Sequence, residues 1–163
     1  MSDRTDDLSR LLDAIRETRF AMFTTRGGDR LRSRPMTVLD VSDEGSVWFL
    51  GARDSDVVAE AAADPRVGLV FADPDDGTYA YVEGNAQLRD DPDRVKELWD
   101  PMAEAWFEGP DDPSIQLIVV RIESGEYWDT PDNGAFRLLG VVKAAVIGDR
   151  EAAGEHGEVT VGF

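Results

Sequence analysis

The sequence predicts a mainly β fold of the α+β class: a split antiparallel β-barrel of about six strands, closed or partly closed and flanked by helices. Six short apolar segments are separated by turns rich in glycine, aspartate and proline, which suit the tight connections of hairpins. Two or three further segments carry apolar residues at helical spacing. With 163 residues the chain can bury one core of this kind, so we expect a single globular domain.

The first half of the chain combines a helix, three strands and a second helix. Leucine and isoleucine recur at helical spacing over residues 8–18. Residues 20–25 and 31–42 flank a turn with two glycines, and residues 46–52 follow a second turn, which together predict a meander of three strands. The alanine-rich residues 54–64 predict a helix that ends before a proline.

The second half predicts a hairpin, a helix and a long strand. Residues 66–73 and 78–90 flank a turn and form the hairpin. Residues 91–107 predict a helix that Pro101 kinks. Residues 115–129 predict a strand with an apolar centre.

Beyond these strands, the sequence predicts little regular structure. Residues 136–148 are compatible with a short helix, and the polar, glycine-containing end is expected to be poorly ordered. We therefore divide the chain into a barrel domain, residues 1–148, and a flexible acidic tail, residues 149–163.

The composition excludes several classes of function. With 34 acidic against 17 basic residues, the chain repels phosphates, so no nucleic-acid partner is expected. Genome composition or a salt-rich cytoplasm is an alternative cause of this acidity. No apolar run approaches the roughly 20 residues that cross a bilayer, which predicts a soluble, cytoplasmic protein without a membrane partner. The lack of cysteine and the single histidine, His156, predict no metal site, thiol nucleophile or histidine triad.

Positive charge gathers in one part of this acidic chain. Residues 16–34 contain six arginines and two acids, a local net charge of +4. Arg30, Arg32 and Arg34 alternate along a predicted strand, so their side chains project from one face and repel one another unless an anion compensates them. Two compensating groups are possible: neighbouring aspartates and glutamates, or a phosphate or carboxylate ligand that fits the guanidinium fork.

The step from the strand at 46–52 into the helix at 54–64 is a second candidate anion site. A helix start offers unpaired N–H groups, and Ser55 adds a hydroxyl. Asp54 and Asp56 oppose an anion there, which favours a plainly capped structural helix.

The aromatic residues leave two interpretations open. They suit a protein core or a subunit interface, and equally the walls of a site for a flat conjugated cofactor. The residues concerned are Trp48, Trp99, Trp106, Phe107, Tyr127 and Trp128.

Taken in order, several motifs resemble one family. They are LRSRPM, VWFLGA followed after two residues by serine, DPRVGLVF, YVEGNAQLRDD, and LWDPMAEAWFEGPDDPSIQLIVVRIESGEYWD. The sequence is similar over residues 8–129 to the bacterial general stress branch of the pyridoxamine 5'-phosphate oxidase-like flavoproteins. The RPM triplet and the WF-x-G-x-DDP segment carry most of the resemblance.

The resemblance implies a homodimeric split barrel with FMN at the dimer interface. By the matching motifs, Arg34, Pro35 and Met36 contact the cofactor, with Arg32 nearby, and the strand backbone at Phe49, Leu50 and Gly51 lines the flavin ring. Ser55 binds the phosphate, and Trp106 closes the site from the other subunit.

The chain departs from the family pattern at the phosphate. Family members have a lysine two residues after the serine, where this chain has Val57 beside Asp56. A charge-assisted contact of this kind is worth about 1.5–3 kcal/mol, so FMN affinity is expected to fall unless Arg53, Arg32 or Arg34 compensates.

The leading hypothesis is therefore an FMN-binding general stress protein, with a weak flavin-dependent oxidoreductase activity. The alternative is a relative that has lost tight FMN binding and acts as a non-enzymatic stress or ligand-binding protein. FAD or another phosphorylated cofactor in the same cleft is a third possibility. Pyridoxamine 5'-phosphate oxidase activity is not expected, because the C-terminal arginine and histidine segment of those enzymes has no counterpart. No catalytic acid or base is assigned, since Glu83 and Glu108 are better read as solvated carboxylates.

Overall fold

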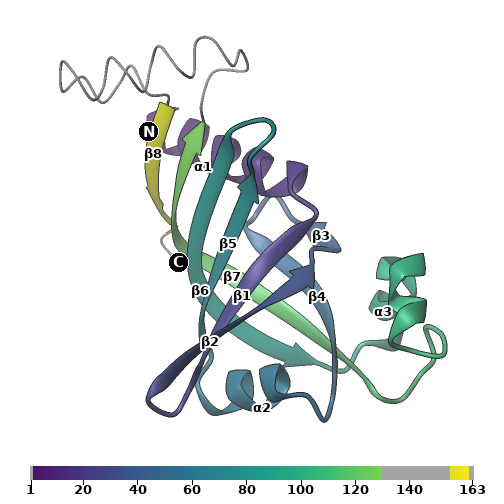
Figure 1. Ribbon diagram of the computed structural model, residues 1–163. Helices are drawn as coiled ribbons and strands as arrows, with labels where there is room; N and C mark the ends of the chain where they lie inside the picture. Colours follow the sequence, from purple (N-terminus) through teal and green to yellow (C-terminus); the bar gives the residue numbers. More distant parts are fainter. Residues whose placement is uncertain (1, 130–154, 162–163) are drawn as a thin grey trace.

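The computed structural model describes residues 2–129 and 155–161, and places them in one antiparallel sheet with three α-helices and a short 3-10 helix (Figure 1). The predicted helix over residues 136–148 lies outside the described residues. No helix of the described ranges is long and apolar enough to cross a bilayer. The elements are α1 (Ser2–Glu17), β1 (Phe20–Gly27), β2 (Arg30–Thr37), β3 (Asp40–Val41), β4 (Ser46–Ala52), α2 (Asp56–Ala63), β5 (Arg66–Asp73), β6 (Thr78–Arg89), α3 (Pro92–Leu98), the 3-10 helix η1 (Pro101–Ala105), β7 (Ile115–Asp129) and β8 (Glu155–Thr160).

The sheet closes on itself because its two end strands are joined in the chain. The strand order is β2-β1-β5-β6-β7-β4-β3, so β2 and β3 are the ends of the order and are linked only by Val38 and Leu39. The Val38 amide donates to the Arg19 carbonyl beside β1 at 2.9 Å, whereas the Leu39 amide donates to Trp48 in β4 at 3.0 Å. Successive amides of an extended chain point to opposite sides, so this link bridges the two edges and makes a split barrel.

All six predicted strands are present, but the predicted meander of three strands is wrong. The expected strand over 31–42 divides into β2 and β3 at the closing link. In the described residues β2 pairs with β1, while β4 pairs with β3 and with the first half of β7, residues 115–121. This arrangement could not be predicted from the sequence, because turn residues do not show which distant strand pairs with a given strand.

The barrel core is built from the inward side chains of both walls. Phe23 of β1 and Phe49 of β4 meet edge to face, with ring centroids 5.1 Å apart, and neither is accessible to solvent. Leu11 and Ile15 of α1 pack on this core, and the buried face of α2 covers the other end (Figure 1).

A smaller apolar cluster holds the segment of α3 and η1 beside the barrel. Val95, Leu98 and Phe107 pack against outward residues of β7 and against Trp48. The predicted single helix over 91–107 is wrong, because the helix is broken rather than kinked: α3 ends at Leu98 and η1 starts at Pro101. The Asp100 side chain accepts from the Met102 amide at 2.8 Å, which caps a new helical turn.

The predicted flexible tail is also partly wrong. Glu155–Thr160 form β8, which pairs with Ser124–Asp129 at the end of β7, and Val159 is buried in the main core. The stretch EVTV alternates charged or polar residues with valines, which is the signal of a half-buried strand. Gly157 has a steric role in this pair, since a Cβ there would lie 2.3 Å from the Tyr127 ring.

The contact between Phe23 and Phe49 should dominate the stability of the barrel. We expect Phe49→Ala to reduce the free energy of unfolding by about 3–5 kcal/mol, because it removes a fully buried ring and leaves a cavity. Urea denaturation followed by circular dichroism measures this. Leu31→Ala is the control: Leu31 is 76% exposed, so its loss should change stability by no more than about 0.5 kcal/mol. Equal effects of the two substitutions would contradict this account of the core.

Candidate functional site

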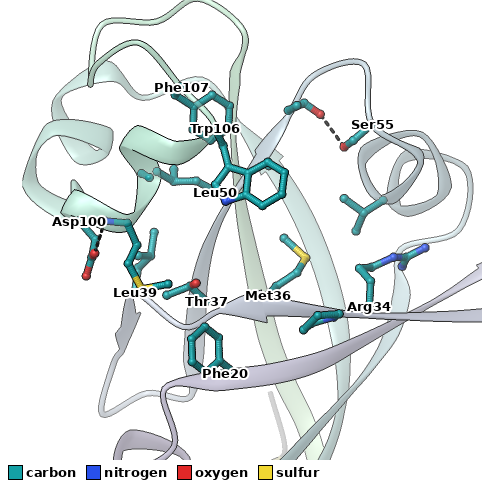
Figure 2. Close-up of a pocket in the computed structure, with 16 residues that line it drawn as sticks. Phe20, Arg34, Met36, Thr37, Leu39, Leu50, Ser55, Asp100, Trp106 and Phe107 are labelled. Carbon is teal, nitrogen blue, oxygen red and sulfur yellow. Dashed lines mark hydrogen bonds between the residues drawn. The ribbon is translucent and has the colours of Figure 1, made fainter.

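A pocket of about 550 Å³ opens between β2, the end of β4 and the segment around η1, residues 100–107. Its volume falls within the range of small-molecule sites. Most of its lining is apolar, and Figure 2 shows Arg34 and Ser55 at one end with Asp100 and Leu39 at the other. The lining residues are Phe20, Arg34, Pro35, Met36, Thr37, Leu39, Leu50, Gly51, Ala52, Ser55, Val57, Asp100, Met102, Ala103, Trp106 and Phe107.

Three structural elements position this lining. The second half of β2 forms one wall, and the end of β4 forms the wall opposite (Figure 2). Gly51 lets β4 and its neighbours pack closely there, since a Cβ would lie only 3.2 Å from Ile118 Cδ1. The η1 segment forms the third wall, and Arg19 holds it: its guanidinium donates to Met102 Sδ at 2.8 Å and lies 3.6 Å from Asp100 Oδ2.

Seven of the ten residues predicted to bind a cofactor line this one pocket, and three do not. The seven are Arg34, Pro35, Met36, Leu50, Gly51, Ser55 and Trp106. Phe49 was expected to contribute its backbone, which stays a prediction; its side chain belongs to the barrel core, because the strand alternates and this side chain points inward. Arg53 turns away toward β6 and β7, where it donates to the Pro113 carbonyl, Gln116 Oε1 and Asp90 Oδ1.

Arg32 and Arg34 are compensated by acids of α2. Arg32 donates to Asp56 Oδ2 at 2.8 Å and to Glu60 Oε1 at 2.7 Å. Arg34 donates to Glu60 Oε2 at 2.8 Å and to Thr25 Oγ1 at 2.6 Å. For Arg32 and Arg34, the compensating groups in the structure are therefore carboxylates of the protein itself.

Glu60 is the centre of this network. Its two oxygens accept from Arg32, Arg34 and the Thr25 hydroxyl, and its side chain is 11% exposed. The hydrogen bond from Thr25 and then those from the two guanidinium groups hold the pKa of the Glu60 carboxyl below its usual value, against the opposing effect of burial. Glu60 is therefore a carboxylate at neutral pH.

The start of α2 differs from the predicted phosphate site. Ser55 is the N-cap residue, but its hydroxyl makes no capping bond and donates instead to the Ala52 carbonyl at 2.6 Å. Val57, which stands where the family has lysine, is buried and lines the pocket. This corner consequently presents an apolar side chain and a hydroxyl whose proton is already engaged.

Trp106 is among the residues that line the pocket of its own chain, and its expected role in the site of a second subunit stays a prediction. It is 82% exposed, the highest value among the large apolar side chains of the described residues. An indole in this position can cover a flat ligand and report its arrival by a change of fluorescence.

Several site residues were not anticipated from the sequence. Phe20, Leu39 and Met102 line the pocket, yet each reads as an ordinary apolar position of a strand or helix. Asp56 and Glu60 stand four residues apart and thus share a helix face, which was an available signal. The contact of this helix face with Arg32 and Arg34 is a tertiary one, between residues about two dozen positions apart in the sequence. Glu83, considered as a carboxylate near the site, accepts from the Tyr81 hydroxyl at 2.8 Å and lies away from this lining.

The chain is an antiparallel split barrel with a pocket between β2, the end of β4 and the η1 segment. The family model described as "Pyridoxamine 5'-phosphate oxidase like" matches residues 6–152. The chain belongs to the pyridoxamine 5'-phosphate oxidase-like family.

Two solved structures named as general stress proteins and one further relative are similar to this chain. A general stress protein 26 from Jannaschia sp. CCS1 superposes with a TM-score of 0.75 at 30% identity, covering 96% of this chain and 99% of that one. The general stress FMN/FAD binding protein of Xanthomonas citri gives a TM-score of 0.66 at 26% identity, covering 76% and 89%. Protein bli-3 of Neurospora crassa is 24% identical over 160 residues, 91% of this chain and 75% of that protein. These comparisons support the family expected from the sequence motifs.

The Glu60 network predicts a pH dependence of stability. Because the folded-state pKa of Glu60 is lowered, its contribution is present above the ordinary value of 4.5 and is lost as pH falls through the lower folded-state value. We expect Glu60→Gln to cost about 1–3 kcal/mol at neutral pH, since the charged acceptor is removed from two arginines. Urea unfolding at several pH values should show this difference shrinking below pH 4.5. A difference that stays constant through the acidic range would contradict the role of the Glu60 charge.

Proposed function

We propose that the protein binds a flavin in the pocket of β2, β4 and η1 and belongs functionally with the general stress flavoproteins. The observation that carries this proposal is the convergence on one pocket of seven residues chosen from the family motifs, among them Met36, Leu50 and Trp106. The general stress protein of Xanthomonas citri, named as an FMN/FAD binding protein, is 26% identical and shares the fold.

The residues present fit the ring of a flavin better than its phosphate. Met36, Leu50 and Trp106 give the pocket apolar and aromatic walls, which suit a flat conjugated ring. At the other end, Arg34 is engaged by Glu60, and Val57 supplies no charge. We therefore propose that the apolar end of the pocket binds the flavin ring. The opposite end, at Arg34 and Val57, differs from the phosphate site that the resemblance implies.

When bound, a flavin supplies hydride and electron transfer, and the protein supplies position and environment. The residues on either side of Pro35 in β2 and Gly51 in β4 line the pocket, and their backbone would hold the ring of the flavin. Trp106 and Met102 limit the access of water from the mouth. Asp100 is the carboxylate among the lining residues, and its Oδ1 is engaged by the Met102 amide, so we assign no proton transfer to it. A weak oxidoreductase activity in the cytoplasm is the function proposed on this basis.

A second candidate is a non-enzymatic relative that has lost tight FMN binding and serves as a stress or ligand-binding protein. The pairing of both Arg32 and Arg34 with acids of α2 favours it, together with Val57 in place of lysine. FAD or another phosphorylated cofactor meets the same difficulty at the phosphate end. The affinity for flavins thus separates the two functions.

The purified protein tests this choice directly. We expect a quenching of the Trp106 fluorescence on titration with flavins, and a yellow colour if the cofactor is retained during purification. Absence of colour and of any binding at concentrations on the order of hundreds of micromolar would overturn the flavin proposal. Trp106→Phe removes the exposed reporter, so the loss of most of the signal in that variant identifies the pocket as the binding site.

Restoring the missing cation should strengthen phosphate binding. We expect Val57→Lys to raise the FMN affinity about tenfold, since a charge-assisted contact is gained at the end of the pocket. Isothermal titration calorimetry measures the affinity. Ala62→Lys is the matched control: it adds the same charge to α2 at an exposed position outside the pocket lining. If both lysines raise the affinity equally, the effect is due to net charge and not to the pocket.

We further propose that two chains form a homodimer through the outward face of β1, β5 and β6. Met22 and Val70 are cross-strand partners on this face, and both are more than 40% exposed. Phe20 joins the face to the pocket, because it is exposed on β1 and also lines the pocket wall. An apolar stripe of this length on a chain with a net charge of -17 is typical of a subunit interface.

Disruption of this stripe should produce monomers. We expect the wild type to elute at twice the chain mass of 18.0 kDa in size-exclusion chromatography with light scattering, and Val70→Glu to elute near that mass. Burial of a carboxylate in an apolar interface carries a desolvation cost that has no compensating partner. Ala62→Glu, exposed on α2, should leave the dimer intact. A wild-type monomer, or a Val70→Glu dimer, would contradict the proposed interface.

A further inference from the structure

Glu60 pairs with the arginine that lines the pocket, although Glu60 itself is not among the lining residues. Arg34 is the one guanidinium among the lining residues, and Figure 2 shows it at the same end as Ser55. Its nitrogens donate to Glu60 Oε2, Thr25 Oγ1 and, at 3.4 Å, the Phe23 carbonyl. Both terminal nitrogens of this guanidinium are therefore engaged within the protein.

The fold makes room for the Glu60 carboxylate at this place. Gly27 ends β1 directly beside it, and a Cβ at Gly27 would lie 2.9 Å from Glu60 Oε1 and 3.3 Å from Arg32 Cδ. Thr25, two residues earlier on the same strand, is almost fully buried and directs its hydroxyl to the other oxygen of Glu60. The end of β1 thus leaves space for the Glu60 carboxylate, and both of its oxygens accept hydrogen bonds.

The two arginines and the two acids around the Glu60 carboxylate have opposite charges that cancel. Arg32 and Arg34 face Asp56 and Glu60, which leaves no net positive charge for a phosphate, and Val57 adds none. Ser55 contributes its hydroxyl proton to Ala52 and not to the pocket. A doubly charged phosphate entering here would meet a partly buried carboxylate of like charge and would have to displace it from three donors.

We propose that Glu60 determines the ligand specificity of the pocket: its carboxylate takes the place of a ligand phosphate, so the site favours a flavin without a phosphate, of the riboflavin type, over FMN. This inference rests on the proposed flavin function and names the form of flavin that the pocket accepts. Glu60 acts through Arg34 and Arg32, and is accordingly a specificity-determining residue and not a catalytic one.

Titration of the full-length protein with riboflavin and FMN at one pH and ionic strength tests the proposal. We expect the wild type to bind riboflavin at least as tightly as FMN. Glu60→Gln, which keeps the shape and removes the charge, should tighten FMN binding about tenfold and change riboflavin binding by less than about twofold. Glu44→Gln makes the same chemical change at an exposed turn and should alter neither affinity. A wild-type preference for FMN of more than about tenfold, or an equal effect of Glu60→Gln on both ligands, would overturn the proposal.

A second measurement decides the proposal even if no flavin binds. Inorganic pyrophosphate should raise the unfolding temperature of Glu60→Gln more than that of the wild type, with potassium chloride of equal ionic strength as the reference, because only the variant has arginines available to an anion. Equal responses of the two proteins would refute the role of Glu60. Absence of flavin binding in both proteins, with the pyrophosphate difference present, would refute the flavin function alone.

Discussion

The divergence of two hydrogen bonds at Val38 and Leu39 is the constraint on which the rest of the structure depends. One amide continues the ladder to the β1 side, and the next joins β4, so the two ends of the strand order become neighbours. This closure brings the second half of β2 opposite the end of β4, and Leu39 itself lines the pocket between them. The walls of the site are therefore a consequence of how the barrel closes, and not of any one motif.

The helix α2 connects the core to the electrostatics of the site. Its apolar side, Val57, Val58 and Ala61, covers one end of the barrel, while Asp56 and Glu60 meet the arginines of β2. The Arg34–Glu60 pair is mostly buried and therefore costly to separate, because the partner left behind has no other compensation, whereas the Arg32–Asp56 pair is exposed. Arg32 and Arg34 thus help to hold α2 against the barrel. An anionic ligand group has to compete with the acids of α2 for these two arginines.

The pocket is apolar at the end expected to hold the ring of the proposed flavin, and it departs from the expected phosphate site at the other end. The chain belongs to a family that contains a protein named for FMN and FAD binding, and its pocket keeps an apolar slot with an exposed indole at the mouth. At the other end, an apolar Val57 and an engaged Ser55 replace what the family motif would supply. A change confined to one end of a pocket alters which ligand is favoured more readily than it abolishes binding, because the contacts to the ring are unaffected.

The sequence by itself determined the six barrel strands, the first two helices and the family, because hydrophobic periodicity, turn residues and ordered motifs are local properties of the chain. It also selected seven residues that share one pocket. Only the tertiary structure decided the strand partners, the break at Trp99 and Asp100, and the pairing of β8 with β7. The tertiary structure also decided what Arg32 and Arg34 bind. They pair with Glu60 because α2 packs beside β2, and the sequence gives no local signal for a contact between residues so far apart in the chain.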